Sequence, residues 1–133
     1  MSGNTTVESA TTEIRWDSEQ RVAHVRYRSG ASLTSPDGDF LAGTLAGWVG
    51  ASAQPFAILA DAAGLQSTDA AYRAKASGFF RLHREHSFIA LVNVGPLIQV
   101  VVELFGLGTG IPLKTFASEA AARTWLRSKG IAA

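Results

Sequence analysis

Two acidic residues, Asp61 and Asp69, are the first candidates for chemistry in this sequence. Asp61 ends an apolar run at residues 56–60, and Asp69 immediately precedes a helical pattern. If the loop between them folded back, the two carboxylates could form a pair for acid–base catalysis. A simpler interpretation makes Asp61 the polar end of a buried strand and Asp69 the N-cap of a helix. Because the sequence has neither a Ser-His-Asp order nor a nucleophile elbow, we expect a protein that is not an enzyme.

A second group of candidate ligands, His83, Glu85 and His86, suggests a metal site. Divalent ions need three or four convergent ligands, whereas one helix end supplies at most two histidines, with the acid pointing elsewhere. Histidines near the C-terminal end of a helix also interact favourably with its dipole, which explains both residues without a metal. We therefore expect no metal site here.

Three alternate glycines, Gly106, Gly108 and Gly110, are similar in composition to a nucleotide-binding loop. A phosphate-binding loop follows a strand and opens a helix, whereas these glycines follow a helical pattern and precede a strand. Glycine readily adopts the left-handed conformation that ends helices, so we expect these residues to stop a helix. No cofactor is expected.

The composition limits both the size of the domain and its partners. The chain has 133 residues, of which 47% are hydrophobic and 17% charged, as in a single globular domain. Its 12 basic and 11 acidic residues give a net charge of +1. This balance predicts neither nucleic acid nor an anionic membrane as a partner. The lack of cysteine excludes disulfides and thiolate metal sites.

Residues 1–12 are polar and lack the basic start and apolar middle of a secretory signal. We expect them to form a flexible N-terminal tail, followed by a single domain at residues 13–133. The longest apolar stretch, residues 95–107, contains Gln99 and Glu103 and is therefore not a membrane span. These features predict a cytoplasmic protein without membrane insertion.

Alternating strand and helix patterns define the framework that must position these residues. Apolar and β-branched runs predict strands at residues 13–17, 21–28, 56–61, 88–94 and 112–116. Capping signals and three- and four-residue spacings predict helices at residues 35–49, 69–86, 95–107 and 120–129, with Ser35, Asp69 and Ser118 as caps. The order ββαβαβαβα predicts an α/β fold, in which an antiparallel hairpin begins a mostly parallel central sheet with helical cover.

The segment from Asp61 to Asp69 resembles the signature of the STAS domains. In that family an apolar strand ends in Asp or Asn, and a loop leads to Asp-Ser-Ser-Gly at the start of the next helix. Asp61 matches the strand-end residue and Asp69 matches the helix-opening acid, with matching spacing. Residues 116–121, followed by Trp125 and Leu126, are similar to the SpoIIAA-like (anti-sigma factor antagonist-like) family. The resemblance spans residues 13–127 and implies a regulatory domain that acts through protein contacts.

The sequence departs from this family at the residue that carries its regulation. Ala70, Ala71 and Tyr72 stand where the signature has Ser, Ser and Gly, and the regulatory serine falls on Ala71. Alanine cannot be phosphorylated, which excludes a kinase-controlled switch at this residue. Ser67 and Thr68 lie just before the helix, where a phosphate would meet free N–H groups and the positive dipole end. Both are also ordinary loop and capping residues.

The resemblance places the partner-binding surface on the loop at residues 62–68 and on the start of the following helix. We expect Asp61 and Asp69 to shape and cap this surface. Ser67, Thr68 and Arg73 are its expected exposed contact groups. The complete set of expected site residues is Asp61, Gly64, Ser67, Thr68, Asp69, Tyr72 and Arg73.

The predicted helix that contains residues 97–105 is apolar on nearly all sides apart from Gln99 and Glu103. Such a helix needs more cover than one sheet face provides. It forms a homodimer contact, lines a pocket for an apolar ligand, or is covered by the preceding helix. Two functions therefore remain open. The first is a regulatory SpoIIAA-like protein-interaction domain that binds a protein partner or a second copy of itself, and the second is the binding or sensing of an apolar small molecule or lipid.

Overall fold

The structure, a computed structural model, describes residues 4–51 and 53–133. In chain order, its strands are β1 (Asn4–Glu8), β2 (Thr12–Asp17), β3 (Val22–Tyr27), β4 (Ala31–Leu33), β5 (Phe56–Asp61), β6 (Leu65–Thr68), β7 (Ser87–Val92) and β8 (Leu113–Phe116). Its helices are α1 (Ser35–Val49), α2 (Ala70–Leu82), α3 (Pro96–Thr109) and α4 (Glu119–Ser128). Each predicted strand and helix is present, and β1, β4 and β6 are additional to the prediction.

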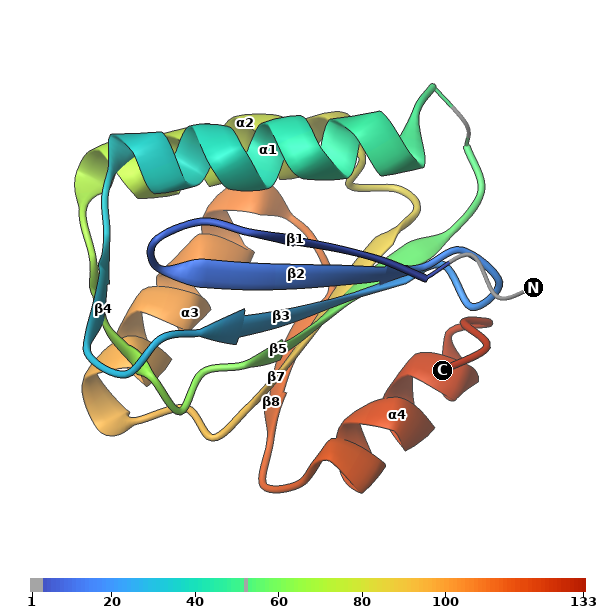
Figure 1. Cartoon of the computed structure of the whole chain (residues 1–133). Coiled ribbons are helices and arrows are strands. Elements are labelled where there is room, and N and C mark those ends of the chain that lie inside the picture. Colours follow the sequence, from blue (N-terminus) through green and yellow to red (C-terminus); the bar gives the residue numbers. More distant parts are fainter. Residues whose placement is uncertain (1–3, 52) are drawn as a thin grey trace.

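The central sheet has the strand order β1-β2-β3-β5-β7-β8. Its first three strands are antiparallel, whereas β3, β5, β7 and β8 run parallel to one another. Strands β4 and β6 form a separate parallel pair (Figure 1). This architecture confirms the predicted α/β fold with a mostly parallel central sheet that begins with an antiparallel hairpin.

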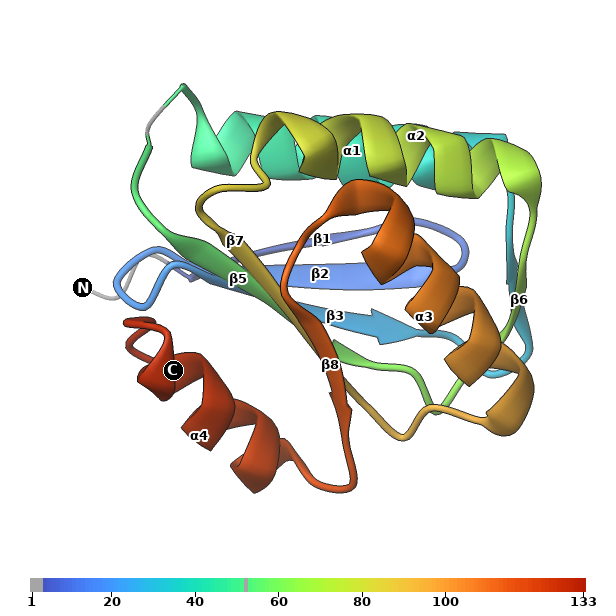
Figure 2. The ribbon, with the colours of Figure 1, turned by 180° about the vertical axis from the view of Figure 1, so that it is seen from behind.

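Helices cover both faces of the sheet because its central strands are apolar along their length. Every residue of β5 before Asp61 is buried, as expected for a parallel strand between two helical layers. Helices α1, α2 and α3 lie on one face, and α4 lies on the other (Figures 1 and 2). Neighbouring strand residues alternate between the two cores: Ile58 belongs to the larger core under α1–α3, and Leu59 to the smaller core under α4.

Local side-chain signals start the helices close to the predicted positions. Asp69 and Ser118 cap α2 and α4 as predicted, each accepting a backbone N–H from the first turn. The cap of α1 is Thr34, one residue before the predicted Ser35. The backbone N–H of Thr34 donates to the Asp37 carboxylate at 2.8 Å, as in a capping box.

The ends of α2 and α3 differ from the prediction. Helix α2 ends at Leu82 rather than His86, because the chain turns there to enter β7. Helix α3 continues through Gly106 and Gly108, which were expected to stop it, and Gly110 ends it in the left-handed conformation with φ +71°. Glycine costs a helix about 1 kcal/mol per residue, so tertiary packing can carry a helix through it.

The prediction of a flexible tail over residues 1–12 is wrong for its central part, where β1 forms. This strand pairs with β2 over its whole length, from Asn4 opposite Asp17 to Glu8 opposite Glu13. The threonines and valine of the segment favour β structure, and the pairing covers the free edge of β2. Residues 1–3 of the predicted tail lie outside the described residues.

The two segments predicted as loops, residues 29–34 and 62–68, contain the strands β4 and β6. The strands have three and four residues, too few for an alternating pattern to identify them in the sequence. They pair in parallel, and Leu33 of β4 is almost fully buried. This pair brings residues 65–68 under the start of α2.

Gly64 allows the turn between β5 and β6 to pass close to the end of β3. A Cβ atom at this position would lie 2.4 Å from the carbonyl oxygen of Tyr27 and 2.7 Å from that of Arg28. Both contacts are with backbone atoms, which cannot move aside as a flexible side chain can. A larger residue here therefore has to displace the chain itself.

We predict that Gly64→Ala lowers the free energy of unfolding by about 2 kcal/mol or more, because the added methyl group meets backbone atoms. Gly78→Ala is the matched control. Gly78 lies inside α2, and a Cβ atom added to it would have no neighbouring atom within 4 Å, so alanine there should stabilise by up to about 1 kcal/mol. Urea denaturation of both variants measures the difference, and equal stabilities would contradict the prediction.

Candidate functional site

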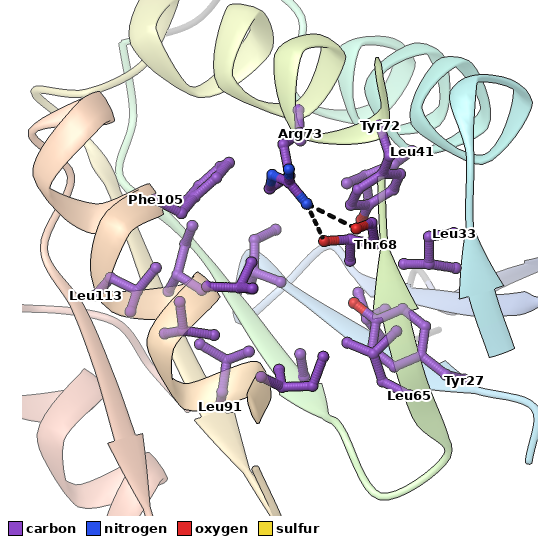
Figure 3. A pocket seen from close by; sticks show the side chains of 18 of the residues that line it. Tyr27, Leu33, Leu41, Leu65, Thr68, Tyr72, Arg73, Leu91, Phe105 and Leu113 are labelled. Atoms are coloured by element: carbon purple, nitrogen blue, oxygen red, sulfur yellow. Dashed lines mark hydrogen bonds between the residues drawn. The ribbon is translucent and has the colours of Figure 1, made fainter. Parts of the chain in front are cut away.

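An apolar pocket of about 100 Å³ lies between the central sheet and the helices α1, α2 and α3. We call it the α3 pocket (Figure 3). Aliphatic and aromatic side chains form nearly all of its wall. The lining residues with polar side-chain atoms are Tyr27, Thr68, Tyr72 and Arg73. Apolar concave sites with a few polar groups are typical of small-molecule binding.

The inner face of α3 supplies one wall of the α3 pocket, through Ile98, Val101, Val102 and Phe105. Phe105 packs edge-to-face on Phe80 of α2, with ring centroids 6.1 Å apart. The preceding helix therefore covers only part of α3. One of the roles expected from the sequence, the lining of a pocket, describes this inner face.

Two tyrosines, Tyr27 and Tyr72, line the α3 pocket (Figure 3). Burial raises the pKa of Tyr27 to about 12. Burial, with Tyr27 as its neighbour, raises the pKa of Tyr72 well above its usual value. Both phenols are therefore neutral at neutral pH and contribute neither a charge nor a base to the pocket.

Arg73 is the one cation among the residues that line the α3 pocket. Its Nη1 donates to the carbonyl oxygen of Thr68 at 2.6 Å and to Thr68 Oγ1 at 3.0 Å. These bonds tie the first turn of α2 to β6 and hold the guanidinium group against the pocket (Figure 3). Among the described residues, no hydrogen bond engages Nε or Nη2 of Arg73.

The expected site residues separate into groups with different surroundings. Thr68, Tyr72 and Arg73 line the α3 pocket, although Tyr72 is buried rather than part of an outer surface. Asp69 is occupied as the helix cap, accepting from the N–H of Tyr72 at 2.8 Å. Ser67 is exposed on β6. Their role in partner binding stays a prediction.

Asp61 and Gly64 lie away from the α3 pocket, beside a groove on the opposite face of the sheet. The Asp61 carboxylate accepts from the N–H of Ala63 and from the Asn93 side chain, each at 3.0 Å. Asp61 and Asp69 thus have separate structural partners. This arrangement gives no support to a catalytic carboxylate pair.

The groove has a volume of about 480 Å³ and is larger than the α3 pocket. Its lining contains charged side chains of both signs and therefore favours no single class of ligand. Its three acids, Glu13, Asp61 and Glu119, are balanced by three arginines, Arg15, Arg26 and Arg123, and His24 also lines it. Charged groups on an open strand surface are well solvated, and exposed pairs of this kind contribute little. The α3 pocket is therefore the stronger candidate site.

The outer face of α3 carries a row of exposed apolar side chains, which we call the α3 stripe. Leu97 is 82% exposed, Val100 56%, Leu104 65% and Leu107 84%. The spacing of three, four and three residues places them along one side of the helix. None of them lines the α3 pocket, so α3 presents different apolar faces to the pocket and to the outside.

His83 and His86, the metal candidates of the sequence, contact each other in the turn after α2. The Nδ1 of His83 lies 3.1 Å from Nε2 of His86, and both rings pack edge-on against Phe56. No group of three His, Cys, Asp or Glu residues within the described ranges could hold a metal ion. Burial, with His86 as the second cause, lowers the pKa of His83.

Sequence reasoning missed most of the pocket wall because that wall comes from many elements. Tyr27 ends β3, and Leu33 and Leu65 belong to the two short strands that the sequence did not predict. In the sequence, the one feature that suggested a pocket was the helix containing residues 97–105, which is apolar on nearly all sides. No linear pattern connects Tyr27 to Tyr72, and the fold is needed to bring them together.

We predict that His24, on the groove side of β3, makes the protein less stable in acid. Burial and then the charges of Arg15 and Arg123 lower the pKa of His24 from 6.5 to about 4. The unfolded chain therefore binds this proton more readily than the folded one. Stability should fall as the pH drops from about 6.5 to about 4, with no further loss from this group below that range.

His24→Asn removes the titrating group and should flatten this part of the stability profile. Urea denaturation across the same pH interval measures the effect. The same pH dependence in both proteins would assign the acid sensitivity to other groups.

Comparison with known proteins identifies the fold. No protein-family model and no curated protein sequence matches the chain. Among solved structures, an uncharacterised DUF3478-family protein with a SpoIIAA-like fold, from Shewanella loihica, has a TM-score of 0.63 at 15% identity, over 93% of this chain and 92% of that chain. The Bacillus cell-fate determinant SpoIIAA, in its phosphorylated form, has a TM-score of 0.54 at 18% identity, over 94% and 100%.

A part of a much longer protein has the same architecture. The murine anion transporter solute carrier 26 family member A9 has a TM-score of 0.58 at 14% identity, over 96% of this chain but 22% of that chain. In the described part of our chain, no helix is long and apolar enough to cross a membrane. The comparisons with solved structures show that the chain has a SpoIIAA-like fold, as the sequence resemblance implies.

Proposed function

We propose that this protein is a non-enzymatic binding domain that takes a small apolar ligand into the α3 pocket. The observation that supports this function is the pocket itself, about 100 Å³ with aliphatic and aromatic walls. An engineered cavity of about 150 Å³ with walls of this kind binds benzene. The α3 pocket therefore suits a ligand about the size of benzene, or the apolar part of a longer ligand.

The polar groups of the pocket support binding rather than catalysis. Tyr27 and Tyr72 are neutral, and the hydroxyl group of Thr68 accepts a hydrogen bond from Arg73. Covalent catalysis needs a nucleophile with a base in reach, and acid–base catalysis needs a group that titrates near the working pH. The residues that line the α3 pocket supply neither.

We predict that the wild-type protein binds 1-octanol, a probe with an alkyl chain, and that Val101→Phe prevents this binding. Val101 lines the pocket, and the larger ring fills space that the ligand needs. The matched control is Val100→Phe, the same substitution on the outer face of the same helix. A rise in melting temperature with increasing 1-octanol reports binding.

Wild type and Val100→Phe should both be stabilised by the probe, and Val101→Phe should not. The proposal fails if both variants respond alike, because binding would then not depend on the pocket.

A regulatory role through protein contacts, the first hypothesis from the sequence, is the second candidate. The α3 stripe supports it, since a contiguous exposed apolar row marks interaction surfaces. The fold also supports it, since SpoIIAA is an anti-sigma factor antagonist. Ala71 is the second residue of α2, where the resemblance expects the regulatory serine. Partner exchange would thus not depend on phosphorylation of that residue.

A second copy of the chain is the partner that this role makes easiest to test. An apolar row along one helix is self-complementary when two copies meet across a two-fold axis. We predict that Leu104→Glu shifts the protein toward monomer, because the charge would be buried in that contact. The control is Thr124→Glu, which adds the same charge on α4, on the opposite face of the sheet. Sedimentation velocity over a range of concentrations measures the state, and a monomeric wild type would exclude the homodimer.

A further inference from the structure

We propose that the ligand of the α3 pocket is an aliphatic carboxylate, with its alkyl chain in the pocket and its carboxylate on the guanidinium group of Arg73. This inference rests on the proposed function and names the class of ligand for the same site. It follows from three properties of the pocket: a cation with unused donors, no acid among the lining residues to pair with that cation, and walls that are otherwise apolar.

Arg73 has donors to offer. Nη1 is engaged by the two oxygens of Thr68, at 2.6 and 3.0 Å. Within the described part of the chain, Nε and Nη2 make no hydrogen bond, and neither of them is a buried atom without a partner. They therefore face water or the pocket. The planar fork of a guanidinium group matches the two oxygens of a carboxylate.

Among the described residues, the charge of Arg73 has no protein counterion. The ion pairs there join Arg28 to Glu8, Lys75 to Asp39 and Arg123 to Glu119. Asp69, the nearest acid along the chain, is engaged by the N–H of Tyr72. A cation beside apolar walls and without a partner is favourable for an anion that brings its own apolar body.

The rest of the pocket determines the other end of the ligand. Beyond Arg73, the tyrosine pair and Thr68, the wall contains only aliphatic and aromatic side chains, including Ile58, Ile89 and Leu91 on the sheet. Such walls offer no hydrogen bond to a second polar group. A ligand with one acidic end and a hydrocarbon body satisfies both parts of the site.

Thr68 keeps Arg73 in position before any ligand arrives. Its carbonyl oxygen and its hydroxyl group both hold Nη1, and β6 fixes Thr68 through its pairing with Leu33 of β4. A guanidinium group fixed in this way loses less freedom on binding than a free one. The short β4–β6 pair thus supports the binding group, although it lies outside the central sheet.

The test compares octanoate with 1-octanol, which carries the same alkyl chain without the charge. Both are titrated by calorimetry into wild type, Arg73→Gln and the control Lys75→Gln. Lys75 lies on α2 next to the pocket residues, pairs with Asp39 at 2.6 Å and does not line the pocket. The control therefore removes one positive charge from the same helix and leaves the site intact.

Wild type and Lys75→Gln should bind octanoate about tenfold or more tightly than 1-octanol, since a hydrogen bond to a charged group is worth that much. Arg73→Gln should lose this preference and bind octanoate no more tightly than 1-octanol. Across butanoate, hexanoate and octanoate, affinity should rise about fourfold per methylene until the pocket is full.

The outcomes of this test distinguish the carboxylate inference from the proposal of an apolar binding site. Binding of 1-octanol with no preference for octanoate, or a preference that survives in Arg73→Gln, would overturn the carboxylate inference and leave the apolar site standing. If neither probe binds to the wild type, both the ligand class and the proposed function are wrong.

Discussion

The apolar character of β5 and β7 is the constraint on which the rest of the structure depends. Parallel strands that are buried on both faces require helices on both sides of the sheet. The helices are divided unequally between the two faces, with α4 on one face and α1, α2 and α3 on the other (Figures 1 and 2). On the three-helix side, α1 and α2 pack against each other so closely that a Cβ on Gly38 would lie 2.9 Å from the Lys75 side chain.

Helix α3 packs less closely than α1 and α2 do, and this looser packing leaves room for the candidate site. It packs on α2 through Phe105 and Phe80, while its remaining inner residues face the sheet across the pocket. The aliphatic side chains there, from both α3 and the sheet, leave about 100 Å³ between them. The outer side of the same helix remains apolar and exposed. The two roles that the sequence suggested for this helix, a pocket wall and a homodimer contact, thus concern its opposite faces.

The sequence predicted those parts of the fold that have a strong local signal. Each of these signals is contained in a short stretch of sequence. Examples are the continuous apolar run of β5, the caps Asp69 and Ser118, and the helical spacing of α1. Strand β1 and the β4–β6 pair have no such signal, because pairing with distant residues stabilises them. The adjacent Phe79 and Phe80 are a similar case. Both are buried, one against Phe56 and the other toward Phe105, which only the tertiary structure decides.

For the candidate site, three of the residues that the sequence singled out, Thr68, Tyr72 and Arg73, line the α3 pocket. The start of α2 was expected to present Thr68 and Arg73 to a partner, and this role stays a prediction. The resemblance to STAS domains directed attention to an outer surface. The residues that complete the pocket come from β3, β4 and α3, which no local pattern connects to α2.

The central claim is that a ligand enters the α3 pocket rather than the charged groove or the α3 stripe. Amide chemical shifts, followed by NMR during a titration with octanoate, test it most directly because they locate the binding site. If the ligand binds in the α3 pocket, saturable shifts should centre on Tyr72, Arg73 and Phe105. Shifts confined to Arg15, His24 and Arg26 in the groove, or to the exposed residues of the stripe, would contradict it.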